Sequence, residues 1–198
     1  MASSWERLAS VTLSSTGSTL SSGTFTAKEH LRVTFITIPS GAANPRVRLN
    51  NDSGNNYARR RSEDYGSENT VTSDDDVDYG RGTGDVVHGS LDIINIATKE
   101  KLVESHSSVS NGDGAGNAPK SGEIVWKWVN TSDQVTRIDV INSQSGDFAV
   151  GSTITVWGAD DQASTPVYPK LQDGSIYEEQ DTGKIYIWNL STNTWSEI

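Results

Sequence analysis

The stretch GEIVWKWVNTSDQVTRIDVINSQSGDFAVGSTITVWGAD, residues 122–160, decides the fold class. It contains three runs in which β-branched or aromatic residues alternate with other residues, namely residues 124–129, 136–140 and 153–157. Polar turn formers, Asn-Thr-Ser-Asp and Ser-Gly-Asp, separate the runs. Such alternation with a period of two is typical of antiparallel strands. It places Trp126 and Trp128 on one face of the first strand, where we expect them to lie in the core.

The same pattern extends outward along the chain. Further alternating runs predict strands over residues 5–13, 20–26, 31–38, 46–49, 57–62, 86–96 and 101–109. The last two of these are expected to form a hairpin around residues 97–100. No segment has a helical period, and so many strands need two sheets to bury their apolar faces. The prediction is therefore an all-β fold, a two-sheet antiparallel sandwich that is jelly-roll-like.

Two segments are predicted to be loops. Residues 62–85 are acidic and poor in apolar side chains, which favours a long surface loop. Residues 111–121, NGDGAGNAPKS, form a glycine-rich loop. Pro45 restricts its segment to the start of a strand or to a sheet edge.

The chain divides into two parts at the sequence level. We expect the sandwich to span residues 1–160, a linker with two prolines to span 161–169, and a small β-hairpin interaction module to span 170–198. A unit as short as this module has too little core to be stable alone. Its aromatic residues are expected to pack on the main domain, a neighbouring subunit or a partner, as interface residues. They are Tyr177, Tyr186, Trp188 and Trp195.

Composition excludes several classes of function. The formal net charge is −10, which disfavours binding to nucleic acid phosphates. The chain has no cysteine, which excludes disulfides and thiolate metal sites. The first ten residues lack the pattern of a signal peptide, and no apolar run is long enough to cross a bilayer. We expect a soluble protein with neither nucleic acid nor membrane as a partner.

The acidic run is the one candidate for a metal. Asp74, Asp76 and Asp78 have the alternating spacing that oxygen ligands of Ca²⁺ adopt. An EF-hand loop, however, needs Gly after the third ligand, where Tyr79 stands, and Glu at the twelfth position, where Asp85 stands. Calcium is thus a weak candidate, a solvated acidic loop is the favoured interpretation, and no cofactor is expected.

No catalytic motif is recognisable. His30, His88 and His106 are far apart and belong to no ligand motif, and the chain has no Gly-x-Ser-x-Gly element. Glu178 and Glu179 are neighbours, so on a strand they would point to opposite faces rather than converge on one glycosidic bond. The sequence therefore predicts a protein that is not an enzyme.

Several blocks of the chain resemble a known family. RVRLNNDSGNNYARR, IINIATKEKLVESH, NGDGAGNAPKSGEIVWKWVN and DVINSQSGDFAVGSTITVWGAD resemble structural proteins of tailed phages and tailed viruses, over roughly residues 5–160. DGSIYEEQDTGKIYIWN, residues 173–189, is similar to a small module appended to many virion proteins. That module commonly reads T-D-T-G-K-x-Y-x-W, and here Gln180 replaces the first Thr.

The resemblance implies a non-enzymatic virion component, most simply a protein that decorates or cements the outer capsid of a tailed double-stranded DNA virus. It would be assembled in the host cytoplasm and would contact the major capsid protein or other virion proteins. A symmetric homo-oligomer, with a trimer as the first expectation, would suit repeated capsid positions. The place on the particle stays open among capsid, turret, fibre and tail.

Two further questions stay open. Arg46 and Arg48 share a strand face, and they either dock onto an acidic neighbour such as the capsid shell or pair with the acidic residues 62–85 of the same chain. The alternative function is a carbohydrate- or receptor-binding module of a viral fibre or tail. Its candidate aromatic residues are Tyr65, Tyr79, Trp157 and Trp188.

Overall fold

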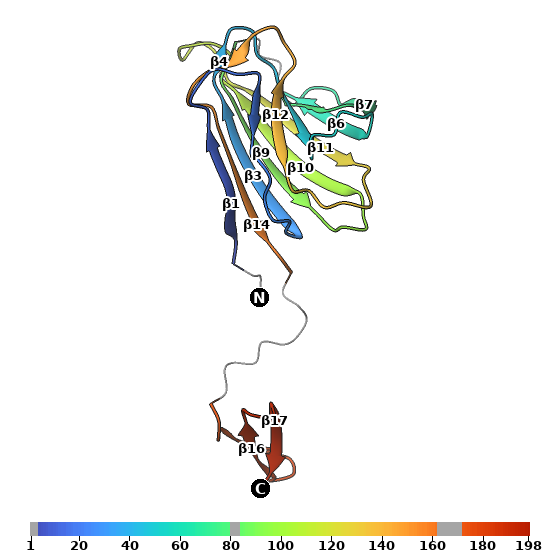
Figure 1. Ribbon diagram of the computed structural model, residues 1–198, viewed down its shortest axis with the longest axis vertical. Helices are drawn as coiled ribbons and strands as arrows, with labels where there is room; N and C mark the ends of the chain where they lie inside the picture. Colours follow the sequence, from blue (N-terminus) through green and yellow to red (C-terminus); the bar gives the residue numbers. More distant parts are fainter. Residues whose placement is uncertain (1–3, 80–83, 162–171) are drawn as a thin grey trace. The chain divides into compact units, whose positions relative to one another are not determined.

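The computed structural model describes residues 4–79, 84–161 and 172–198 (Figure 1). The chain separates into two compact units, Met1–Asp161 and Gln162–Ile198. We call the described residues of the first the sandwich unit and those of the second the tail unit. Regular structure in both is β, and in these ranges no helix is long and apolar enough to cross a membrane.

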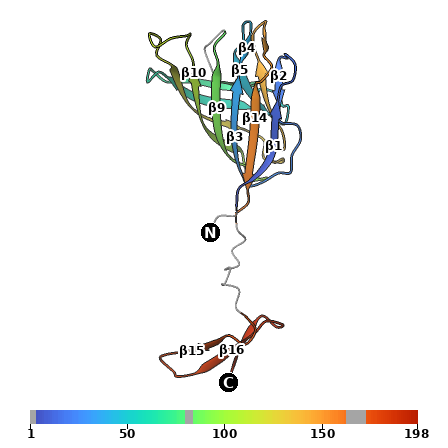
Figure 2. The same ribbon diagram turned by 90° about the vertical axis from the view of Figure 1, so that its left-hand side faces the viewer.

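The sandwich unit is built on an antiparallel sheet of eight strands (Figure 2). Their order across the sheet is β1 (Glu6–Thr12), β14 (Thr153–Ala159), β3 (His30–Thr37), β9 (Val87–Ile94), β10 (Lys101–Val109), β11 (Lys120–Trp128), β6 (Tyr57–Glu63) and β7 (Asn69–Asp74). A sheet of four strands has the order β2 (Thr19–Ser21), β12 (Ile138–Asn142), β5 (Pro45–Leu49) and β8 (Val77–Asp78). A short pair, β13 (Asp147–Phe148) and β4 (Pro39–Ser40), completes the unit. The predicted all-β sandwich is confirmed.

Alternating burial along the strands creates the core. On β10 every second residue from Lys101 to Val109 is buried and the others are exposed. Trp126 and Trp128 are each only 2% exposed, as the period of two predicts. Complete burial of a large apolar side chain contributes about 1.5–3 kcal/mol, so these inward faces are the main source of stability. The other side of the eight-stranded sheet faces solvent.

The three runs of residues 122–160 become strands but do not become neighbours. The first, β11, lies between β10 and β6 in the eight-stranded sheet. The second, β12, lies in the four-stranded sheet between β2 and β5. The third, β14, returns to the eight-stranded sheet between β1 and β3. Between β11 and β14 the chain thus passes from the eight-stranded sheet to the four-stranded sheet and back.

The prediction that residues 62–85 form a surface loop holds for the exposed turn at residues 64–68 but is wrong for residues 69–79. This segment forms β7 and β8, and Val77 and Tyr79 are completely buried. Asp76 and Asp78 are also buried, at 4% and 8% exposure. Carboxylates leave water at acceptable cost only when they are paired, and arginines of the facing strands supply the partners. A composition poor in apolar residues therefore did not mean exposure here.

The tail unit is a three-stranded antiparallel sheet of β15 (Ile176–Glu178), β16 (Ile185–Asn189) and β17 (Thr194–Glu197). The division of the chain after Asp161 lies one residue from the boundary predicted at residue 160. Of the predicted linker, residues 161–169, all but Asp161 lies outside the described residues.

Candidate functional site

The solvent side of the eight-stranded sheet, which we call the outer face, carries one aligned row of side chains. The strand registers place them opposite one another on consecutive strands. The row runs through Trp157, Arg32, Asp92, Glu104, Val125 and Arg60. Adjacent strands are about 4.8 Å apart, so the row offers ring, charged and apolar groups at a regular spacing.

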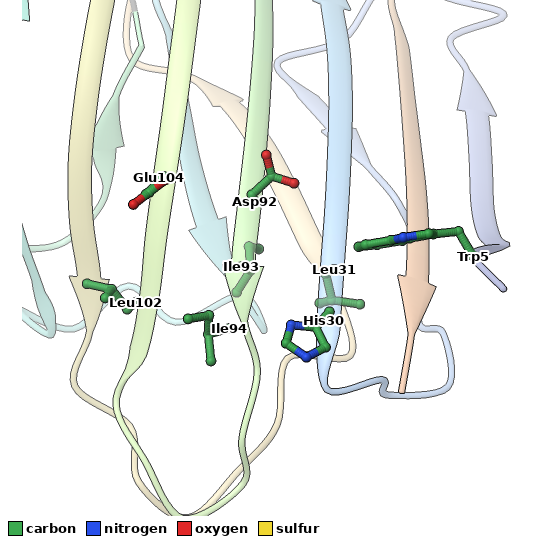
Figure 3. A pocket seen from close by; sticks show the side chains of 8 residues that line it. All are labelled: Trp5, His30, Leu31, Asp92, Ile93, Ile94, Leu102 and Glu104. Atoms are coloured by element: carbon green, nitrogen blue, oxygen red, sulfur yellow. The ribbon is translucent and has the colours of Figure 1, made fainter. Parts of the chain in front are cut away.

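A hollow of about 240 Å³ lies on this face beside the row (Figure 3). Its wall combines apolar side chains of β9 and β10, Ile94 and Leu102, with the carboxylates Asp92 and Glu104. Trp5 precedes β1, and its ring extends toward β3 at the other side of the hollow (Figure 3). The hollow therefore joins an exposed ring surface to two hydrogen-bond acceptors.

Arg32 organises the charges of the hollow. Its Nε lies 2.7 Å from Asp92 Oδ1, and this hydrogen-bonded pair raises the pKa of Arg32. The guanidinium carbon of Arg32 also lies 5.7 Å from the centre of the Trp5 ring, within the range of a cation–π contact. Glu104 stands directly opposite Asp92 in the register of β9 and β10. Like charges in that position repel, and Arg32 offsets the repulsion on the Asp92 side.

A second, shallower hollow of about 300 Å³ adjoins the first at Leu102. It lies over β6, β7, β10 and β11 and is bordered by Val125, Arg60 and Lys127. Ile94, Leu102 and Val125 are 44%, 48% and 51% exposed. Large apolar side chains framed by charges of both signs are suited to contact with a macromolecule.

The tail unit presents a separate surface. Tyr177 faces Tyr186 across β15 and β16, and Trp188 faces Trp195 across β16 and β17. Tyr186 and Trp188 are two residues apart on one strand, so all four rings share one side of the sheet, which we call the aromatic face. Ring centres are 6.3 Å apart for Tyr177 and Tyr186, 6.1 Å for Tyr177 and Trp195, and 5.3 Å for Trp188 and Trp195. A groove of about 330 Å³ crosses this face.

The four predicted interface aromatics differ in exposure. Tyr177 and Trp195 are 53% and 39% exposed and line the groove together with Tyr186. Trp188 is 9% exposed, because Trp195 and its own unit cover it. The tail unit thus buries Trp188 and leaves Trp195 partly exposed. Packing of the aromatic face on another surface stays a prediction.

Of the two interpretations of Arg46 and Arg48, the structure shows the pairing within the chain. Arg46 Nη1 lies 2.8 Å from Asp76 Oδ1, and Arg48 Nη2 lies 2.5 Å from Asp75 Oδ2. Burial raises the pKa of Asp76, and the hydrogen bond from Arg46 opposes this rise. Arg46 and Arg48 are therefore engaged by the acidic run rather than held out for an acidic neighbour.

The acidic run does not fit the predicted calcium spacing. Carboxylates of Asp74, Asp75 and Asp76 come together, within 4.8 Å of one another. Asp78 instead pairs with Arg61, at 3.1 Å between Oδ2 and Nη1. Asp74 pairs with Arg59. Because guanidinium groups already supply the positive charge, this arrangement does not fit a calcium site formed by Asp74, Asp76 and Asp78.

The four aromatic residues proposed for carbohydrate binding lie in different environments, and one of them, Trp188, is the buried tryptophan of the tail unit. The prediction of Tyr79 as a binding residue is wrong, because Tyr79 is fully buried and its hydroxyl accepts a 2.9 Å hydrogen bond from Trp126 Nε1. Tyr65 is 90% exposed at the turn between β6 and β7. Trp157 belongs to the outer face at 38% exposure.

The histidines do not meet at a common centre. His88 and His106 are exposed on the neighbouring strands β9 and β10, but the register pairs each with a serine rather than with the other. His30 Nε2 lies 3.0 Å from Asp161 Oδ1. Each of the three therefore has a local surface environment of its own.

The hollow of the outer face escaped the sequence-based prediction. Arg32, Asp92 and Glu104 occupy outward positions of strands that were predicted, so their exposure follows from the period of two. Their alignment does not, because it depends on the pairing of β3 with β9 and of β9 with β10. Trp5 precedes β1 and carried no pattern of its own.

Comparison with known proteins adds little to this description. No family model matches the chain, and no curated protein matches it. Among solved structures, a crystal structure of scytalido-glutamic peptidase with a peptide-based transition-state analog is similar over 99% of this chain and 74% of that chain. The sequence identity is 10% and the TM-score is 0.21, which carries no argument about fold or activity.

Proposed function

We propose that the chain is a non-enzymatic structural protein of a tailed double-stranded DNA virus and that it decorates the outer surface of the capsid. Two lines of argument support this proposal. One is the resemblance of residues 5–160 and of the tail to virion proteins. The other is the character of the outer face, which is broad and shallow and exposes Ile94, Leu102 and Val125 among charged side chains.

The outer face is the observation that carries the proposal. Stable protein interfaces bury about 1,200–2,000 Å² in total and have an apolar centre with a polar rim. On the outer face the exposed apolar side chains Ile94, Leu102 and Val125 lie next to charged side chains, which are Asp92, Glu104 and Arg60. In the proposed mechanism, many copies, arranged as symmetric oligomers with a trimer as the first expectation, bury this face against capsid proteins and bridge neighbouring shell subunits.

Cryo-electron microscopy of purified particles tests the location. The proposal expects density for this protein in regular copies on the capsid lattice, and density confined to the tail tip would overturn it. Rebinding to particles stripped of the protein then tests the surface. Leu102→Glu is expected to weaken rebinding by about tenfold or more, whereas Ser145→Glu, in the exposed bend between β12 and β13 and outside the outer face, is expected to leave it nearly unchanged.

A second candidate function is carbohydrate or receptor binding on a fibre or tail. The observation that favours it is the hollow in Figure 3, which has the Trp5 ring at one side and the acceptors Asp92 and Glu104 on β9 and β10. A glycan array probed with the full chain and with Trp5→Ala tests this function. Binding of a defined glycan that Trp5→Ala abolishes would support it, and a flat array for the unmodified chain would exclude the glycans on that array.

A further inference from the structure

The groove of the tail unit has an unusual lining for its size. Three of its four lining residues are the aromatic side chains Tyr177, Tyr186 and Trp195, and the fourth is Glu179. The rings come from three antiparallel strands and are held at fixed angles by ring contacts, 31° between Tyr177 and Tyr186 and 56° between Tyr177 and Trp195. The result is a preformed aromatic surface with one carboxylate at its border.

The chemistry of this lining selects among ligands. A saccharide presents many hydroxyl groups that need hydrogen-bond partners, and among the described residues the groove offers Glu179 and the polar tips of its rings. A polyproline II segment presents apolar proline rings, and its backbone carbonyls are free because this helix has no internal hydrogen bonds. Aromatic-lined grooves on small domains bind Pro-x-x-Pro segments in this way, at low entropic cost. The groove therefore favours proline over sugar.

The chain itself contains such a segment. Its sequence reads Pro166-Val167-Tyr168-Pro169-Lys170, with prolines at the spacing Pro-x-x-Pro and a lysine directly after them. The tail unit is acidic, since its described residues include Asp173, Glu178, Glu179, Asp181 and Glu197 against the single cation Lys184. Glu179 at the groove would complement the charge of Lys170.

We propose that the aromatic groove of the tail unit is a binding site for Pro-x-x-Pro segments and that its occupant is the segment 166–170 of this chain. The proline rings would pack against Tyr177, Tyr186 and Trp195, and Lys170 would pair with Glu179. This role does not depend on the viral assignment, because it concerns a peptide ligand that the chain encodes.

Fluorescence anisotropy with a labelled peptide of residues 162–171, QASTPVYPKL, tests the proposal. The receptor is the full chain with Pro166→Ala and Pro169→Ala, so that its own segment does not compete. We expect saturable binding, and we expect a peptide with both prolines changed to alanine to bind at least about tenfold more weakly. Equal binding of the two peptides, or no saturation with the proline peptide, would overturn the proposal.

Variants of the receptor locate the site. Trp195→Ala should reduce affinity about tenfold or more, while Trp157→Ala on the outer face should leave it unchanged. Because Trp195→Ala also removes a contact with Trp188, Glu179→Gln provides a variant that spares the rings. It should weaken binding a few-fold and reduce the dependence of affinity on salt. Unchanged affinity in both Trp195→Ala and Glu179→Gln would reject this groove as the site.

Sedimentation of the unmodified chain distinguishes the source of the segment. Association that grows with concentration and is lost in the double proline variant means docking between copies. In the other outcome, the double proline variant binds added peptide more tightly than the unmodified chain does, while both sediment alike. That result means that the segment docks within one chain. Either result supports segment 166–170 as the occupant of the groove. If the double proline variant shows neither effect, the proposal is contradicted.

Discussion

At the scale of the residue, Gly89 shows how a missing side chain shapes the core. Gly89 lies on β9 opposite Phe35 of β3, and both point inward. A Cβ at this position would lie 2.2 Å from Phe35 Cζ. Phe35 in turn meets Tyr79 edge to face, with ring centres 5.4 Å apart. Glycine usually weakens a strand, but here it leaves the space that the Phe35 ring occupies.

We therefore expect Gly89→Ala to lower the free energy of unfolding by about 1–3 kcal/mol, the usual cost of overpacking a core. Urea denaturation followed by fluorescence measures the change. Gly17→Ala is the matched control, because nothing lies within 4 Å of a Cβ at residue 17. The added variant Phe35→Leu should recover part of the loss in Gly89→Ala. Equal stability of the two alanine variants would contradict the steric explanation.

A second prediction at this scale concerns Asp52. Burial alone would raise the pKa of its carboxyl, but hydrogen bonds from Trp128 Nε1 at 2.6 Å, Asn56 Nδ2 at 2.9 Å and the Gly54 amide at 2.8 Å outweigh it and lower that pKa. A carboxyl with a lowered folded pKa stabilises the fold above its unfolded value of about 3.9, and this stabilisation disappears as pH falls through the folded pKa. Asp52→Asn should thus lower the melting temperature at pH 7.

The difference between wild type and Asp52→Asn should shrink as the pH is lowered below about 4. Thermal unfolding of both proteins between pH 7 and pH 3 gives the comparison. A difference that stays constant over this range would show that the carboxylate charge contributes nothing and that only the shape of the side chain matters.

At the scale of the element, β6 connects the eight-stranded sheet to the buried acidic segment. Its arginines alternate, with Arg59 and Arg61 pointing inward and Arg60 pointing to solvent. Arg61 contacts Glu63 at 2.6 Å and Asp78 of β8 at 3.1 Å. Through such pairs, strands that belong to different sheets are bound to each other by charge as well as by apolar packing.

Arg61→Met should destabilise the protein by about 3–5 kcal/mol, because it removes the buried guanidinium that lies 3.1 Å from the buried carboxylate of Asp78. Arg60→Met, on the same strand, removes an exposed pair with Glu68 and should cost at most about 1 kcal/mol. Chemical denaturation of both variants measures the contrast. Similar losses in the two variants would mean that the buried pair contributes no more than a surface pair.

At the scale of the whole molecule, the two units have different means of stability. The sandwich unit has a core between sheets, whereas the tail unit is a single three-stranded layer. One layer of this size is marginal in water. The fold of the tail unit is stabilised either by the contacts among its own aromatic rings or by packing of these rings on another surface.

Truncation after Asp161 tests whether the stability of the sandwich unit depends on the tail. We expect residues 1–161 to unfold at the same midpoint as the full chain, because the strands and core of the sandwich unit lie within this range. Differential scanning calorimetry of both proteins provides the measurement. A clear fall in the midpoint would instead show that the tail packs on the sandwich, which is one of the three expectations for its aromatic residues.

The extent of prediction from sequence follows from the range of the interactions involved. Alternation within residues 122–160 is local, and it was enough to predict strands and to place Trp126 and Trp128 in the core. The pairing of Arg46 with Asp76 joins residues 30 positions apart, and sequence could only name it as one of two alternatives. Tyr79 was predicted to lie on the surface because the residues before it are acidic, which is typical of exposed loops. In the structure it follows the buried strand β8 and is itself buried.

The sequence by itself determined the all-β class, the positions of most strands and the inward faces of those strands, because the period of two is a property of each strand alone. Only the tertiary structure decided that β12 leaves the sheet that holds β11 and β14, that the acidic segment is buried against arginines, and that Trp5, Asp92 and Glu104 border one hollow. Strand partners, charge pairs and surface hollows depend on residues distant in the chain. These interactions form only between residues that folding brings into contact, so a local sequence pattern does not predict them.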